Sequence, residues 1–259
     1  MGHTRPTLDI LICTIGNGLD RVPSMLLPPT EGVRYIVSAQ YEDSPTVIPK
    51  ELSGRDDVTV DLIPGKGLSR NRNNALRLAA SDICLIADDD SRYRPEFIET
   101  ILSSWQENPQ ADILTFQAQT LEGEPLHPYP ADYVCSIEIT FRRTSITQRG
   151  IRFNERFGLG SPLLSAGEED VFMADARKAG LNICHIPKVI VQTQARTTGT
   201  RFLEDPRIQV TKGATFRYVY GTCSAVWRSF KEAGWYLVHR HVNPLPILFN
   251  MLKGIWILR

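Results

Sequence analysis

Four short apolar runs, each closed by turn or polar residues, constrain the fold of this chain most strongly. They are Leu8–Thr14, Tyr35–Ala39, Val58–Ile63 and Ile83–Ala87. Apolar runs of this length, bounded by turn signals, are typical of buried strands in parallel sheets. Helical patterns over Ser69–Ala80 and Pro95–Gln106 alternate with the runs. This alternation predicts an α/β fold in which helices flank a mostly parallel sheet.

The second half of the chain is less regular. We expect strands at Ile113–Ala118, Tyr133–Phe141, Asn182–Ile186 and Val189–Gln192, and helices at Glu168–Ala179 and Thr215–Phe230. The pattern predicts an α/β domain over residues 1–200 and a helical C-terminal extension over residues 201–259.

Charge and cysteine content argue against a dedicated nucleic-acid binder and against a zinc-binding protein. The 29 Lys and Arg balance the 29 Asp and Glu, and a dedicated nucleic-acid binder would carry a basic excess. The five cysteines show no zinc-ligand spacing, which favours a reducing compartment. The N-terminus lacks the apolar core of a signal peptide, and no run reaches the ~18 to 20 apolar residues of a membrane span. We therefore expect a cytoplasmic protein.

Asp88-Asp89-Asp90 directly follows the fourth apolar run and is the most informative motif. Three carboxylates at the end of a buried strand repel one another and lose hydration. Mn²⁺ or Mg²⁺ would relieve that repulsion and would also bind phosphate oxygens. The tripeptide alone fits a solvated acidic turn before the next helix equally well, and the preceding buried strand favours the metal.

The loop and helix start at Gly65–Asn74 form a second motif. A glycine turn here leads into a helix whose first turn carries Arg70 and Arg72. Free backbone N–H groups and guanidinium groups at a helix N-terminus favour an anionic ligand. The alternative is a plain loop with surface arginines. In a parallel sheet, this loop would lie along the same edge as Gly16, Gln40 and the three aspartates.

Gly167-Glu168-Glu169-Asp170 opens the helix expected at Glu168–Ala179. A carboxylate in this position can remove a proton from a hydroxyl group. Acidic residues also stabilise helix N-termini, and the segment alone favours that capping role.

Other nucleotide and hydrolase motifs are absent from the sequence. Gly16-Asn17-Gly18 lacks the third glycine of a dinucleotide fingerprint, because Arg21 stands there. The sequence has no phosphate-binding Gly-x-x-x-x-Gly-Lys-Ser/Thr motif and no Gly-x-Ser-x-Gly nucleophile elbow.

Taken in order, these motifs resemble those of family 2 glycosyltransferases with the GT-A fold, from about Leu8 to Gln192. The matching pieces are the first strand, Gly67–Asn73, Asp88–Asp90, Phe153–Glu155 and Glu169-Asp170. The resemblance implies a catalytic domain over residues 1–200 that uses a nucleotide-diphosphate sugar, with a UDP-sugar as the default donor. It also implies a Mn²⁺ or Mg²⁺ cofactor and inversion at the anomeric carbon.

The resemblance also implies roles for individual residues. Asp170 would be the catalytic base supported by Glu169, Asp90 would bind the metal, and Asp88 would contact both nucleotide and metal. The other residues expected to bind the nucleotide-sugar are Thr14, Gly16, Gln40, Gly67, Ser69, Arg70, Arg72, Asn73 and Asp89.

Two positions depart from the family pattern. Ser38-Ala39-Gln40 occupy the end of the second strand, where the family usually has an Asp for the nucleobase. Gln192 stands about where many members have a His near the metal.

The C-terminal segment Asn243–Arg259 places six apolar residues on one helical face after Pro246, namely Ile247, Leu248, Met251, Leu252, Ile255 and Trp256. It is too short to span a bilayer, but it could lie in the membrane interface with Arg240, Lys253 and Arg259 near lipid headgroups. The alternatives are packing on the core or a dimer contact.

The resemblance to family 2 glycosyltransferases implies synthesis of a cell-surface polysaccharide or related glycan, on a glycan or lipid-linked acceptor, at the inner face of the cell membrane. A sugar nucleotidyltransferase is one alternative, although Ile15–Leu19 lacks the lysine of its activating loop. A non-catalytic nucleotide- or glycan-binding protein is another, and the joint presence of Asp90 and Asp170 argues against it.

Overall fold

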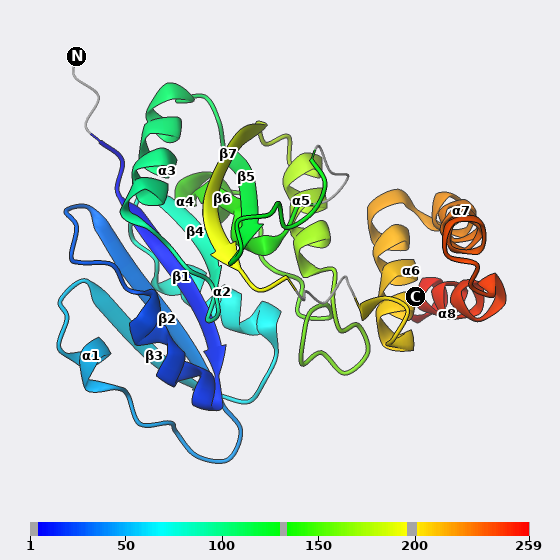
Figure 1. Cartoon of the computed structure of the whole chain (residues 1–259), viewed down its shortest axis with the longest axis horizontal. Coiled ribbons are helices and arrows are strands. Elements are labelled where there is room, and N and C mark those ends of the chain that lie inside the picture. The colour runs from blue at the N-terminus through cyan, green and yellow to red at the C-terminus, as the bar shows by residue number, and fades with distance from the viewer. Residues whose placement is uncertain (1–4, 130–133, 196–200, 259) are drawn as a thin grey trace. The chain divides into compact units, whose positions relative to one another are not determined.

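The computed structural model describes residues 5–129, 134–195 and 201–258. Its centre is a seven-stranded sheet with the order β3-β2-β1-β4-β6-β5-β7 (Figure 1). The strands are β1 (Leu8–Ile15), β2 (Val33–Tyr41), β3 (Val58–Pro64), β4 (Ile83–Asp88), β5 (Ile113–Thr120), β6 (Ile139–Arg142) and β7 (Ile183–Thr193).

Parallel pairing dominates this sheet. Strands β1 to β4 are mutually parallel, and β5 is parallel to β7. Only β6 runs antiparallel to its neighbours β4 and β5. The predicted mixed α/β fold with a mostly parallel sheet is confirmed.

Helices connect and flank the strands. They are η1 (Gly16–Met25), α1 (Lys50–Ser53), α2 (Leu68–Leu78), α3 (Pro95–Glu107), η2 (Ser136–Glu138), α4 (Arg143–Gln148), α5 (Glu168–Lys178), α6 (Pro206–Tyr220), α7 (Thr222–Arg240) and α8 (Pro244–Ile257). The helices η1 and η2 are of the 3₁₀ type.

Helix α3 shows how the sequence pattern builds the core. Pro95 occupies its first turn, where the missing N–H costs no helical hydrogen bond. Its apolar residues recur at helical spacing and bury one face, with Ile101 and Trp105 almost fully enclosed. The Trp105 indole Nε1 donates to Thr140 Oγ1 at 3.0 Å, which satisfies its buried polar atom.

Two strand predictions were wrong in detail. The strand predicted over Tyr133–Phe141 is the short helix η2 followed by β6, and residue 133 lies outside the described residues. The two strands predicted around Pro187 are one strand, β7. Its pairing with β5 shifts register on either side of Gln117, and such irregularities accommodate a proline that cannot donate a ladder hydrogen bond.

The single helix predicted over Thr215–Phe230 was also wrong. Gly221 has a φ of 79°, which ends α6 and starts α7. The positive φ is readily adopted by glycine and breaks the run of helical dihedrals that the hydrophobic pattern suggested.

The residues form two compact units. The first comprises residues 1–66, 70–152 and 175–195 and contains the whole sheet. The second comprises residues 67–69, 153–174 and 196–259, and it contains helices α6 to α8. The segments 67–69 and 153–174 thus group with the C-terminal helices, whereas the sequence pattern places a boundary at residue 200.

Two glycines set the crossing of α6 and α8 inside the second unit. A Cβ atom on Gly213 would lie 1.9 Å from the carbonyl oxygen of Met251, and one on Gly254 would lie 1.8 Å from that of Val210. The two helix backbones therefore touch where neither helix has a side chain. This close contact buries Met251 and Ala214 completely.

We predict that Gly254→Ala destabilises the C-terminal helices. The added methyl group meets backbone rather than a movable side chain, so the helices must separate, and overpacking of this kind costs about 1 to 3 kcal/mol. The melting temperature of the full chain measures the effect. The matched control is Gly234→Ala in α7, where a Cβ meets nothing within 4 Å and the better helix former should slightly raise stability. Equal melting temperatures for the two variants would contradict the close crossing.

Candidate functional site

The carboxyl ends of four parallel strands meet at one edge of the sheet. The register pairs Cys13 of β1 with Asp88 of β4, and Ile15 of β1 with Gln40 of β2. Pro64, at the end of β3, pairs with β2 one residue further along. Open α/β sheets bind their ligands at this edge, because the strand ends and following loops converge there. Three of the predicted site segments therefore start from adjacent strands.

Asp88 is held by a buried arginine. The Arg72 guanidinium donates to Asp88 Oδ1 at 3.1 Å and to Ser136 Oγ at 2.8 Å. The Arg72 side chain is only 2% exposed, whereas the Asp88 side chain remains 37% exposed. Arg72 thus fixes the Asp88 carboxylate while leaving part of it accessible. The predicted phosphate ligand Arg72 is a partner of Asp88 in this structure.

The Asp89 side chain binds residues at the end of β1 and in η1, the helix that follows it. Thr14 Oγ1 donates to its carboxylate, and Arg21 pairs with it at 2.6 Å. Gly18 permits this approach, because a Cβ there would lie 2.3 Å from Asp89 Oδ2. Two predicted donor-binding residues, Thr14 and Asp89, therefore bind each other and fix the turn that follows β1. The pairing of Asp89 with Arg21 was not predicted from the sequence.

Asp90 lies in the most unfavourable electrostatic surroundings of the three. It is half-buried, and no Lys or Arg of the described residues lies within ion-pair distance of it. Burial raises the pKa of this carboxyl, and the neighbouring Asp88 and Asp89 raise it further. A divalent cation shared by Asp88 and Asp90 would supply the missing positive charge. The residues present therefore fit the predicted metal.

Two buried polar atoms near the same edge lack hydrogen-bond partners among the described residues. They are Nε2 of Gln40, at the end of β2, and Oδ1 of Asn71, in the first turn of α2. The Asn71 amide is oriented by its Nδ2, which donates to the Thr14 carbonyl at 2.9 Å. Buried polar atoms are nearly always satisfied, so an orphaned pair suggests a ligand or water. Gln40 is a predicted nucleotide-binding residue, whereas Asn71 was not predicted from the sequence.

The remaining predicted residues around α2 differ in their surroundings. Ser69 is buried and donates to the Phe157 carbonyl at 2.7 Å, so its hydroxyl fixes the loop of the second unit. Arg70 is exposed, and a Cβ on Gly65 would lie 2.8 Å from its guanidinium. Asn73 is half-buried on α2, and Gly67 precedes the helix with a φ of 134°.

Gly16, a predicted donor-binding residue, and Gln192, which departs from the family pattern, both lie in the sheet unit. Gly16 starts η1 with a φ of 54° and has open space where a side chain would stand. The backbone of Gln192 exchanges hydrogen bonds of 2.7 and 3.0 Å with Arg92, two residues after Asp90. Its side-chain oxygen accepts from Arg94 Nε at 3.1 Å. Gln192 thus ties the end of β7 to the segment that follows the aspartates.

Glu169 and Asp170 lie in the first turn of α5, in the second unit. Both are half-buried, and Val171 and Phe172 behind them are fully buried. Phe172 stacks on Phe153 with ring centroids 4.5 Å apart, which anchors this turn. The positive end of a helix favours an ionised carboxylate, as a general base requires.

The comparisons with known proteins bear on the sheet unit most directly. The model for "Glycosyl transferase family 2" matches residues 38–161. This stretch includes Gln40, Asn71, Arg72 and the three aspartates.

Residues 38–161 of this chain belong to glycosyltransferase family 2.

Solved structures show the GT-A fold of this glycosyltransferase. TarS from S. aureus has a TM-score of 0.55 at 14% identity, and the match covers 91% of this chain but only 44% of TarS. TarS 1–349 in complex with UDP-GlcNAc has a TM-score of 0.53 at 13% identity, covering 96% of this chain and 90% of that one.

A third similar structure is the mannosyltransferase PcManGT from Pyrobaculum calidifontis, in complex with GDP-Man and Mn²⁺. It has a TM-score of 0.55 at 12% identity, and the match covers 98% of this chain and 75% of that one. Comparison of the sequence with curated proteins gives no match.

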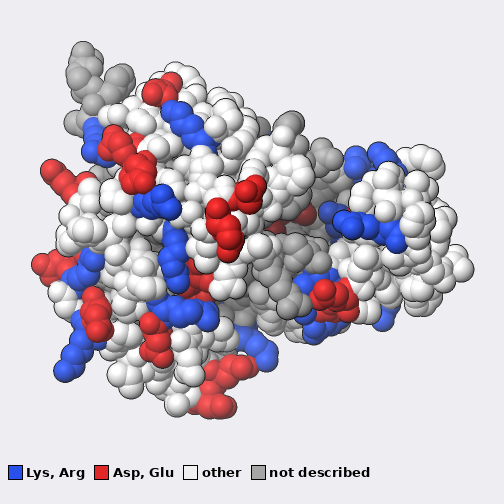
Figure 2. Space-filling view, viewed as in Figure 1, with Lys and Arg blue, Asp and Glu red and all other residues white. Residues whose placement is uncertain are grey.

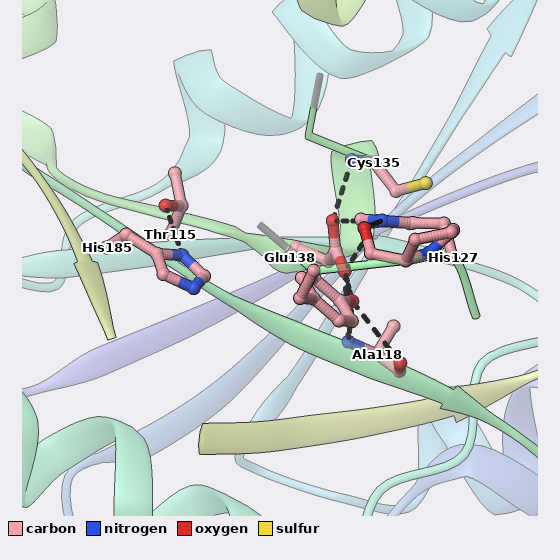
Figure 3. Close-up of polar contacts among 8 residues, drawn as sticks. Thr115, Ala118, His127, Cys135, Glu138 and His185 are labelled. Carbon is pink, nitrogen blue, oxygen red and sulfur yellow. Dashed lines mark hydrogen bonds and ion pairs between the residues drawn. The ribbon is translucent and has the colours of Figure 1, made fainter. Parts of the chain in front are cut away.

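A buried carboxylate fastens the loop that precedes β6 in this glycosyltransferase. Glu138 is fully buried, and its oxygens accept from the backbone N–H groups of Ala118 at 2.9 Å and Cys135 at 2.8 Å (Figure 3). The Tyr129 hydroxyl also donates to it, and His127 Nε2 lies 3.0 Å away. Burial and the bond to Glu138 raise the pKa of Tyr129, so its hydroxyl remains a donor.

The ligand atoms of His127, Cys135 and Glu138 lie within 4.8 Å of one another, as in a metal site. The donors around Glu138 already satisfy both carboxylate oxygens, so a buried structural anchor accounts for the cluster. Ser136 of the same short helix accepts from Arg72, so this anchor also positions the partner of Asp88.

We predict that Glu138→Gln destabilises the glycosyltransferase. Its amide nitrogen would replace an oxygen that now accepts hydrogen bonds and would face the donors as a donor itself. Breaking buried charge-assisted bonds of this kind costs about 2 to 4 kcal/mol in the free energy of unfolding. Urea denaturation measures the change, and Glu122→Gln, exposed on the same connection, serves as the control. A loss below about 0.5 kcal/mol would contradict the anchor.

Proposed function

We propose that this protein is a metal-dependent, inverting glycosyltransferase. It moves a sugar from a nucleotide-diphosphate sugar, with a UDP-sugar as the first candidate, to a hydroxyl group of an acceptor. One observation carries the proposal: Asp90 is a half-buried carboxylate without a cationic partner among the described residues, beside Asp88 at the edge of a GT-A sheet. The strand-end aspartates, the Gly67–Asn73 segment and the Glu169-Asp170 pair support the same function by their resemblance to the family.

On the donor side, Asp88 and Asp90 would hold Mn²⁺ or Mg²⁺. The cation would supply positive charge to a diphosphate leaving group. Arg72 keeps Asp88 in place without covering it, since the Asp88 side chain stays 37% exposed. Gln40 and Asn71 offer one free donor and one free acceptor, which suits hydrogen bonding to a nucleoside. The amide of Gln40 stands where the family pattern has an aspartate that binds the nucleobase. Binding assays with UDP and GDP would identify the preferred nucleobase.

On the acceptor side, Asp170 would take the proton from the attacking hydroxyl group, with Glu169 in support. A single displacement needs one base on the acceptor and inverts the anomeric carbon, so a second nucleophilic carboxylate is unnecessary. Asp170 lies in the first turn of α5, where the helix N-terminus favours a negatively charged group.

We also propose that the acceptor is a glycan or lipid-linked sugar in cell-surface polysaccharide synthesis, and that the protein acts in the cytoplasm at the inner face of the cell membrane. Among the described residues, we find no helix with the length and apolarity needed to cross a bilayer.

We predict opposite effects of Asp90→Asn on activity and stability. The raised pKa means that the folded chain holds this proton more tightly than the unfolded chain, so ionised Asp90 destabilises the fold. This destabilisation grows as the pH rises from about 4, the unfolded pKa, and is fully present above the folded pKa. The neutral variant should therefore keep or raise the metal-free melting temperature at pH 7. Its Mn²⁺-dependent transfer rate should fall on the order of 100-fold.

Calorimetry with UDP and Mn²⁺, together with a transfer assay, checks the metal role of Asp90. The control is Asp43→Asn, an exposed acid on the same unit, which should behave as wild type. Equal Mn²⁺-dependent UDP affinity in wild type and Asp90→Asn would overturn the metal assignment.

We predict that Asp170→Asn retains donor binding and melting temperature while transfer to acceptor falls by about 10²- to 10⁴-fold, the usual contribution of a general base. Glu169→Gln should lose less, because its role is to support the base. Asp175→Asn, in the next turn of α5, is the control and should transfer sugar normally. Near-normal transfer by Asp170→Asn would show that Asp170 only caps the helix.

A further inference from the structure

Helix α7 presents its large apolar side chains to solvent and its small residues to the protein. Ala225, Ser229 and Ala233 form the inward stripe and are at most 1% exposed. On the opposite side, Trp227 is 70% exposed and Val238 is 66% exposed. A surface helix of a soluble protein has the reverse arrangement, with the large apolar residues toward the core.

The outward residues of α7 form one continuous stripe. At about 100° per residue, Trp227, Phe230, Leu237 and Val238 fall within roughly 100° of one another around the helix axis. All four are at least 48% exposed. Single exposed apolar residues are ordinary, but a stripe of them marks an interaction site.

Helix α8 repeats the arrangement with a second stripe. Its inward residues Ile247 and Met251 are buried in a cluster with α6 and α7 residues. Its outward residues Leu245, Phe249 and Trp256 are 68%, 70% and 51% exposed. They lie four and seven residues apart, which places them on the same side of the helix. Both α7 and α8 pack against α6 and against each other, so the two stripes belong to the same group of three packed helices.

Charge is unevenly distributed along the chain. Residues 201–259 hold nine of the 29 Lys and Arg but only three of the 29 Asp and Glu, although the whole chain is neutral. On α7 and α8 themselves, the basic residues Arg228, Lys231, Arg240 and Lys253 are exposed, while Glu232 is the one acid. Viewed as in Figure 1, the surface of α6 to α8 is mostly uncharged with scattered Lys and Arg (Figure 2).

We propose that the outward stripes of α7 and α8 bind the surface of an anionic phospholipid bilayer. Amphipathic helices that lie in a membrane interface combine Trp, Phe and Leu on one side with Lys and Arg near the headgroups. Trp227, Phe249 and Trp256 would enter the acyl boundary, while Lys231 and Lys253 would meet lipid phosphates. The choice of the inner membrane face rests on the function proposed above.

A bilayer surface fits these helices better than a second copy of the chain. Two copies would bring the same basic residues together, and like charges facing each other oppose association. Lysine is also depleted from protein interfaces. Helix α8 has 14 residues, or about 21 Å of helix, which is short of the ~30 Å hydrocarbon core. Helix α8 therefore suits binding in the plane of the interface.

Co-sedimentation of the full chain with vesicles tests this surface. We expect binding to vesicles of phosphatidylcholine with phosphatidylglycerol, and much weaker binding to phosphatidylcholine alone or at high salt. The double variant Trp227→Ser/Phe249→Ser should bind at least about tenfold more weakly, because it removes the two most exposed large side chains of the stripes. The double variant Lys231→Glu/Lys253→Glu should lose the preference for anionic vesicles.

Matched controls lie on other surfaces. Val47→Ser and Leu163→Ser remove side chains that are 85% and 61% exposed, and both should bind vesicles as wild type does. Equal vesicle binding by wild type and the Trp227→Ser/Phe249→Ser variant would overturn the proposal. A dimer in solution that this variant dissociates, without vesicle binding by the wild type, would also overturn it in favour of a second copy.

The sugar-transfer function is assayed separately. UDP release from a UDP-sugar, with a soluble acceptor and no vesicles, should be unchanged in both double variants, because their residues lie outside the proposed donor and acceptor sites. Vesicle binding without any UDP release would leave the docking surface intact and remove the proposed function. UDP release without vesicle binding would support the proposed function and overturn the proposed membrane-binding surface.

Discussion

A buried arginine holds the functional edge of this protein together. Arg72 lies between Asp88, at the end of β4, and Ser136, in the short helix before β6. A buried guanidinium is tolerable only with such partners, because an uncompensated charge in the interior is strongly destabilising. The fully buried Glu138 fixes the helix that supplies Ser136. The acidic edge therefore depends on a chain of contacts that extends away from it into the core.

The sequence located the acidic edge because strand ends are readable from apolar runs. The different partners of the three aspartates could not be predicted from the apolar runs. Asp89 is bound by Thr14 and Asp88 by Arg72, partners 75 and 16 residues away. Arginine in the first turn of a helix looks like a surface residue, and only the packing of α2 shows that Arg72 is enclosed. The proposed roles of Asp90 and Asp170 stay predictions.

Fold class and most element positions followed from periodicity, and the errors share a physical cause. The pattern of apolar residues continues across Gly221, but the backbone turns there with a φ of 79°. The apolar face predicted for this stretch also proved to be partly solvent-facing, since Tyr220 and Trp227 are exposed. Of the face predicted for α8, Ile247, Met251 and Ile255 are buried, while Trp256 is 51% exposed and Arg259 lies outside the described residues. Periodicity identifies an apolar face without specifying what covers it.

The backbone contact between α6 and α8 has a practical consequence for preparing the protein. Cutting the chain before Asn243 would remove the apolar stripe of α8. It would also expose Gly213 and Val210 of α6, which α8 now contacts. The newly bared groove is lined by main chain and small residues, and such a surface promotes aggregation. Replacing outward side chains one at a time leaves the groove filled. A well-behaved sample for crystallisation is therefore better sought by surface substitution than by shortening the chain.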